Sequence, residues 1–357
     1  MTIHIIKAIF LVVVLSHVFS CSGQVKSKNK SSESQKVTLG KSVSKLDKQI
    51  WNIFQDSKAN YWFGSKKSGL YLFDGEKLTQ FTTEDGLPSN QIQGVQEDKN
   101  FNLLVHTGKG ISKFDGKKFT LLNIVQSTDN EWKLGADDLW FANIDNGVYR
   151  YDGENVFVLE LPTKDIEKVL GITASNTSYS PYAIAGMGKD KSGNVWFGTG
   201  LAGAFRFDGD SFLWIAEKEL SRLEDGREPG VRSIVEDKDG NIWLSNIRYK
   251  YKITSENTYE KLPGINLSEH NVSIELPYYM SAVSDDKDNL WMVSFDEGVW
   301  KYDGEKLQQF IPKQDNKEIL LLTIFKDKDG TMWLGTYDDG VYRYNGEDFE
   351  KFEVDQH

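Results

Sequence analysis

Cysteine, proline and long apolar runs are all scarce in this sequence of 357 residues. It has one Cys, so no internal disulfide can form and packing alone must hold the core. Its 7 Pro stand against 31 Gly, which favours many short strands joined by glycine turns. Beyond residue 20, no segment approaches the roughly 18 apolar residues that a membrane helix needs.

Basic residues are also in the minority, and they are unevenly distributed. The formal net charge is −11, made up of +1 in residues 1–20, +5 in residues 21–48 and −17 in residues 49–357. Nucleic-acid-binding proteins present basic surfaces, so an acidic main part argues against a nucleic-acid partner. We expect a solvated surface of the kind found on exported proteins.

Residues 1–20 predict a secretory signal, with Lys7 ahead of an apolar run that is too short to span a bilayer. The run ends in a small residue before Cys21, which resembles a bacterial lipobox. The resemblance implies that Cys21 becomes diacylated, which would anchor the protein stably. Residues 21–48 then predict a flexible basic tether. We expect an extracytoplasmic bacterial lipoprotein of the outer membrane.

One pattern occurs seven times between residue 53 and the C-terminus. Each copy has an apolar strand with a large anchor side chain. In six copies a Gly-ended loop follows, and then a further strand that ends in Asp-Gly or Asn-Gly, a strong hairpin signal, whereas the second half of the fifth copy is degenerate. The anchors lie 36 to 56 residues apart, a spacing typical of propeller blades. We expect them in the core: Trp62, Leu104, Trp140, Trp196, Trp243, Trp291 and Trp333.

Each copy predicts four antiparallel strands, and one such sheet cannot bury both of its faces alone. Packed radially, each sheet covers its neighbours and the ring hides their edges. The sequence therefore predicts an all-β, monomeric, seven-bladed β-propeller over residues 49–357. Copies two and five fit the repeat least well. Ring closure is left open, because residues 37–49 could add an outer strand to the last blade, or each blade could be complete.

The repeat itself, seen in residues 190–199 (DKSGNVWFGT) and 327–336, resembles the two-component regulator propeller repeat. Residues 81–90 are similar to the linkers between blades in that family. There, such propellers are extracytoplasmic sensor parts of hybrid histidine kinases and often respond to glycans. This chain carries no membrane helix or kinase after the repeats. The resemblance therefore implies a stand-alone recognition module.

Metal binding and glycosidase chemistry are weakly indicated. Acidic residues alternate in three turns, at Asp237 with Asp239, Asp327 with Asp329 and Asp286 with Asp288. Calcium loops use such spacing but also need a late bidentate Glu, which does not recur here. We expect hairpin turns with no metal and no cofactor. The Asp spacing also differs from that of sialidase Asp-boxes.

A lyase similar to the streptogramin-inactivating enzymes, which are also seven-bladed, is the enzymatic alternative. Such chemistry needs a positioned general base. Among 5 His, only His106 and His270 lie away from the signal and the C-terminus. Each is more typical of an exposed loop residue. No catalytic residues are predicted.

Binding is the function that the sequence favours most. In a propeller, the loops between strands two and three share a face with the connections between blades, and here they hold non-repeated residues. Aromatic side chains beside polar ones suit recognition of sugars or peptides. The predicted ligand-binding residues are Asn143, Asp145, Tyr182, Arg248, Tyr279, Asp296, Tyr337 and Asp338.

The leading prediction is therefore a non-enzymatic, lipid-anchored propeller, attached to a membrane, that binds an unidentified glycan, peptide or protein. Besides the lyase, a structural subunit of an outer-membrane complex is a further alternative.

Overall fold

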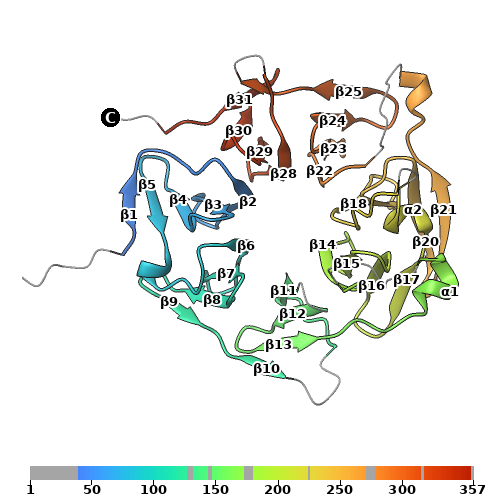
Figure 1. Cartoon of the computed structure of the whole chain (residues 1–357), viewed down its shortest axis with the longest axis horizontal. Coiled ribbons are helices and arrows are strands. Elements are labelled where there is room, and N and C mark those ends of the chain that lie inside the picture. The colour runs from blue at the N-terminus through green and yellow to red at the C-terminus, as the bar shows by residue number, and fades with distance from the viewer. Residues whose placement is uncertain are drawn as a thin grey trace, which may run out of the picture. The chain divides into compact units, whose positions relative to one another are not determined.

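A computed structural model describes residues 39–126, 132–143, 147–172, 180–223, 226–270, 278–314 and 317–354. The unit from Thr38 to His357 is compact, and its seven main sheets stand radially around a central opening (Figure 1). This confirms the seven-bladed propeller. Among the described residues, no helix has both the length and the apolar character needed to cross a membrane.

The first three sheets follow one another in chain order. Blade one contains β2 (Ile50–Gln55), β3 (Tyr61–Ser65), β4 (Leu70–Phe73) and β5 (Leu78–Phe81), with β1 (Lys41–Val43) outside β5. Blade two contains β6 (Ile92–Glu97), β7 (Leu103–Thr107), β8 (Gly110–Phe114) and β9 (Phe119–Leu121). Blade three contains β11 (Leu139–Ala142), β12 (Val148–Tyr151), β13 (Val156–Leu159) and β10 (Ile124–Gln126).

The remaining four sheets each have the expected strand order. Blade four contains β14 (Ile184–Lys189), β15 (Val195–Thr199), β16 (Ala204–Phe207) and β17 (Phe212–Ile215). Blade five contains β18 (Ile234–Glu236), β19 (Ile242–Leu244), β20 (Tyr249–Ser255) and β21 (Thr258–Pro263). Blade six contains β22 (Ser281–Ser284), β23 (Leu290–Val293), β24 (Val299–Tyr302) and β25 (Leu307–Phe310). Blade seven contains β28 (Leu321–Lys326), β29 (Met332–Thr336), β30 (Val341–Tyr344) and β31 (Phe349–Lys351).

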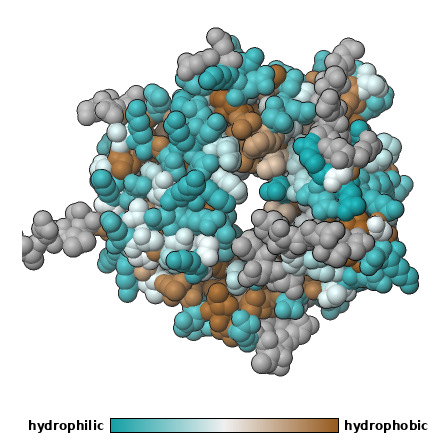
Figure 2. Space-filling model, viewed as in Figure 1, coloured by the Kyte–Doolittle hydropathy of each residue, from teal (hydrophilic) through white to brown (hydrophobic). Residues whose placement is uncertain are grey.

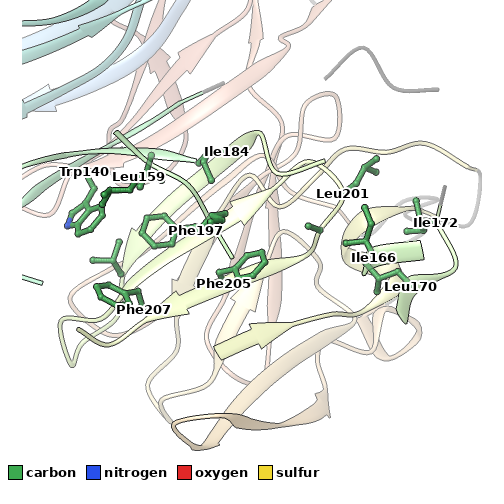
Figure 3. Close-up of a cluster of buried hydrophobic side chains, with 14 residues drawn as sticks. Trp140, Leu159, Ile166, Leu170, Ile172, Ile184, Phe197, Leu201, Phe205 and Phe207 are labelled. Carbon is green, nitrogen blue, oxygen red and sulfur yellow. The ribbon is translucent and has the colours of Figure 1, made fainter. Parts of the chain in front are cut away.

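Short elements occupy the connections between blades. They are α1 (Ile166–Leu170), α2 (Lys218–Ser221), η1 (Thr83–Asp85), η3 (Leu267–His270) and a small hairpin of β26 (Lys313–Gln314) and β27 (Lys317–Glu318). Figure 3 shows α1 packing against the layer between blades three and four. There Trp140 of β11 meets Phe197 of β15 at 5.6 Å between ring centroids. The core therefore consists of layers between neighbouring blades.

The acidic turns serve to fix the anchor tryptophans. In blade five, the Asp237 carboxylate accepts hydrogen bonds from the backbone of Asn241 at 2.8 Å and from Trp243 Nε1 at 3.0 Å. Burial raises the pKa of Asp237, but the bonds from Trp243 and Asn241 outweigh burial and hold the pKa below its usual value. All seven anchor side chains are buried.

The same indole-to-carboxylate bond recurs in blades one, four, six and seven. In blade six the acceptor is Asp285, at 3.0 Å from Trp291 Nε1, one position before the Asp286 that the sequence suggested. The turn carboxylates are thus engaged with their own hairpins. Within the described residues, no group of three or more acidic, His or Cys side chains is placed to hold a metal.

Blade three departs from the predicted four antiparallel strands. Its sheet has the order β10-β13-β12-β11, and β10 runs parallel to β13 on the outside. The anchor strand β11 is therefore the innermost, whereas in every other blade a preceding strand lies inside the anchor strand (Figure 1). Blade two, which fits the repeat poorly in sequence, has all four strands.

The ring closes by contact between complete blades. Residues 41–43 pair with β5 of the first blade and add no strand to the last one. Across the seam, the Tyr61 hydroxyl donates to Asp327 at 2.7 Å, and the Phe352 ring lies 5.2 Å from that of Phe73 in blade one. Side-chain packing and hydrogen bonds between blades seven and one therefore close the ring. No blade combines strands from both ends of the described chain.

Candidate functional site

The predicted ligand-binding residues divide into a buried group and an exposed group. Tyr279 is 1% exposed, and burial raises the pKa of its hydroxyl well above the usual range. Tyr182 is half-buried, and its hydroxyl donates to the Lys164 carbonyl at 2.8 Å. Asn143 is buried directly after β11. These three side chains therefore support the fold, and Asp145 lies outside the described residues.

The exposed group comes from the loops after the anchor strands of blades five, six and seven. Arg248, Asp296 and Asp338 are exposed. Tyr337 is 42% exposed, and its ring meets that of Phe295 edge-on at 5.9 Å between centroids. Blades six and seven thus present aromatic rings next to carboxylates, as recognition of a polar ligand requires.

A second aromatic group lies on the neighbouring blade one and was not predicted. The Lys66 ammonium stands 3.9 Å from the ring centroid of Trp51, a cation–π contact. Burial, and then the charge of Lys67, lowers the pKa of Lys66. The Trp51 indole N–H is buried without a hydrogen-bond partner. The sequence signal for this pair was Trp51 itself, a tryptophan in the strand before the anchor strand and not at an anchor position.

Residues 48 and 49 bring the two groups side by side. The Lys48 carbonyl accepts from Gly340 N at 2.8 Å, in the loop that carries Tyr337. The Gln49 carbonyl accepts from Lys66 N at 3.2 Å. We call this region the loop surface, and it comprises Trp51, Lys66, Phe295, Asp296, Tyr337 and Asp338.

A pocket of about 450 Å³ opens beside the loop surface at the seam of blades seven and one. It is lined by residues 44–48, 339–341 and 351–354, including Lys45, Asp339 and Phe352. Its volume falls in the usual range for small-ligand sites, and it combines charges of both signs with an aromatic wall. A polar ligand with an apolar face would suit it.

The two candidate general bases do not form a catalytic arrangement. His106 is 4% exposed in β7, so the expected exposed loop position is wrong; its ring packs 5.7 Å from Phe141, and burial lowers its pKa to about 4. His270 ends η3, with its ring 6.4 Å from Tyr302, next to the blade-six hairpin turn. His106 lies near the end of β7, beside the loop that follows this anchor strand. His270 lies at the opposite end of its blade, where the hairpin turns are.

Comparisons with known proteins agree with this architecture. The family model of the two-component regulator propeller matches residues 226–248 and 314–338, so the chain carries at least two repeats of this type. A search of curated protein sequences finds no significant match.

Solved structures of similar fold include an extracellular domain and a lyase. The extracellular domain of the one-component system BT4673 from B. thetaiotaomicron is 20% identical, with a TM-score of 0.57 over 86% of this chain. The chain spans only 40% of the length of that protein.

Virginiamycin B lyase from Staphylococcus aureus is 13% identical, with a TM-score of 0.58, 85% of this chain and 97% of the lyase covered. YCF48 from Cyanidioschyzon merolae is 14% identical, with a TM-score of 0.59, 87% of this chain and 99% of YCF48 covered. At these identities the likeness concerns the fold alone.

Proposed function

We propose that this chain is a non-enzymatic, extracytoplasmic recognition module that binds a glycan, peptide or protein at the loop surface and the adjoining seam pocket. The observation that carries the proposal is the meeting of the exposed Tyr337 ring, half-buried aromatic rings, both signs of charge and a pocket of about 450 Å³ at one seam. Aromatic faces bind the apolar sides of sugars and peptides, while the charges orient polar groups.

The proposed location outside the cytoplasm has support of two kinds. The N-terminal residues have the pattern of a signal with a lipidated Cys21, and a similar solved propeller is an extracellular domain. In this proposal the lipid holds the propeller at a membrane, and the predicted tether over residues 21–48 gives it reach as far as Lys41, where pairing with β5 begins. Fatty-acid labelling of the wild type but not of a Cys21→Ser variant is the expected result; labelling of both would contradict anchoring at Cys21.

Binding is tested by screening a glycan array and a peptide array, with thermal shift as the second readout. We expect a ligand whose affinity falls at least tenfold in Tyr337→Ala and in Lys66→Ala, because each substitution removes one wall of the loop surface. Lys117→Ala, in the exposed hairpin turn of blade two, is the matched control and should bind as the wild type does. Equal binding by all three variants would show that the loop surface is not the site.

A further inference from the structure

Among the described residues, no strand pairs with the inner edge of β11 in blade three, which faces the central opening (Figure 1). Asn143 N donates to Gly147 O at 3.2 Å, so odd-numbered residues of β11 direct their backbone groups toward β12. Backbone groups alternate along a strand, so residues 138, 140 and 142 direct theirs to the other edge. In the other six blades this edge is paired with an inner strand.

Side chains from the flanking blades cover part of this edge. Gln96 of blade two donates its amide to the Trp140 carbonyl at 2.6 Å, and Lys189 of blade four donates to the Asp138 carbonyl at 3.3 Å. The N–H and C=O of Ala142 have no such partner among the described residues. One donor and one acceptor of a β-ladder are thus left available at Ala142.

The face of blade two that packs against blade three also meets no inner strand among the described residues. In blade four, a Cβ added at Gly186 would collide with the carbonyl of Arg232, in the chain leading to β18 of blade five. The corresponding residue of blade two is Gly94, where an added Cβ would meet only side-chain carbons, at 3.8 Å. Blade two therefore faces a space that blade four does not.

His106 stands at the outer end of this space. Gly198 holds the same position in blade four, and a Cβ there would collide with the Val231 carbonyl. The imidazole of His106 is accommodated because it packs on Phe141 and, at 5.8 Å, on Tyr149. Neither of its nitrogens forms a hydrogen bond within the described part of the chain.

We propose that an extended peptide pairs antiparallel with β11 through the N–H and C=O of Ala142 and becomes the inner strand of blade three. The other six blades show what this position accepts: antiparallel strands of three to six residues, namely β2, β6, β14, β18, β22 and β28. Main-chain hydrogen bonds give affinity in such strand addition, and side-chain pockets give specificity.

The neighbouring side chains define the peptide further. At Gly64 of blade one, an added Cβ would lie 2.7 Å from the Ile92 side chain, which starts the next inner strand. His106 stands where Gly64 does, so the peptide residue beside the imidazole must be small. A space-filling view shows the central opening from which this edge would be reached (Figure 2). The site is separate from the loop surface, so either proposal can fail alone.

A displayed library of random ten-residue peptides, selected on the full chain, tests the proposal. Selected peptides should slow hydrogen–deuterium exchange at the amide of Ala142 at least tenfold, and the same amide should exchange fast in the free protein. Slow exchange in the free protein would mean that the edge is already occupied. Failure to select peptides, or selected peptides that leave this amide unprotected, would equally overturn the proposal.

Two variants sharpen the result. Ala142→Pro removes the N–H on the open edge and no ladder bond to β12, so peptide affinity should fall at least tenfold. Ala142→Val keeps the N–H and is the matched control. Lys117→Ala, in the exposed hairpin turn of blade two and outside both proposed sites, should leave peptide affinity unchanged. If Ala142→Pro does not fold, exchange at Ala142 in the wild type still decides the question.

Discussion

Blades three and four carry the same anchor motif but are built differently at the centre of the ring. Blade four has β14 inside its anchor strand, paired antiparallel with it, and its glycines at 186 and 198 allow the next blade to approach closely. Among the described residues, blade three has no strand inside β11, and it has β10 on its outside. The difference shows that a four-stranded blade can form with its additional strand on the outside of the sheet, at β10, in place of the inner position.

The loss of the inner strand explains the placement of His106. Burial is the cause that lowers its pKa to about 4, against about 6.5 for an unperturbed imidazole. Between these two values the unfolded chain binds more protons than the folded one, so stability falls as the pH drops from 6.5 toward 4.

The largest expected effect follows from this pKa. The wild type should lose about 3 kcal/mol more stability between pH 7 and pH 4 than His106→Phe, which cannot titrate. Urea unfolding at both pH values measures the difference. An identical pH dependence in the two proteins would mean that His106 is not buried against blade three as described.

The next effect compares glycines at matched positions. Gly186→Ala should destabilise the protein by roughly 1–3 kcal/mol, because its Cβ meets the backbone of the chain leading to β18. Gly94→Ala should be nearly neutral, since only carbons at 3.8 Å surround the added methyl group. Thermal and urea unfolding of both variants measure this. Equal losses would show that blade two faces an inner strand after all.

The smallest effect concerns the anchor tryptophans. Trp196 Nε1 donates to Asp190 at 3.0 Å, whereas Trp140 Nε1 is buried and has no partner among the described residues, because Leu134 takes the place of that aspartate. Trp196→Phe should therefore cost about 1–2 kcal/mol more than Trp140→Phe. Both variants lose similar volume, so each is the control for the other. The order of their urea midpoints checks the expectation.

Much of the fold could be predicted because its signals are local. Asp-Gly turns and one large anchor per repeat specify each hairpin, and seven such sheets must pack radially to bury both faces. The sequence pointed to Tyr337 and Asp296 because these residues break the repeat, and the structure exposes both side chains. Trp51 and Lys66 were missed because their partnership depends on how β2 meets the loop after β3.

Ring closure, the inner edge of blade three and the burial of Tyr279 were decided only by tertiary structure. The sequence does mark blade three, since Leu134 replaces the turn aspartate and Asp138 instead binds Arg150 at 2.6 Å. The loss of the aspartate indicates that the usual turn before the anchor strand is absent. It does not indicate which strand, if any, pairs with the inner edge of β11.

The sequence by itself thus determined the repeat, the blade and the number of blades, because hairpins and anchors depend on residues close in the chain. Only the tertiary structure decided which strand lines the opening and which aromatic rings face solvent. Those outcomes depend on the space left by neighbouring blades, as His106 and Gly94 show beside blade three.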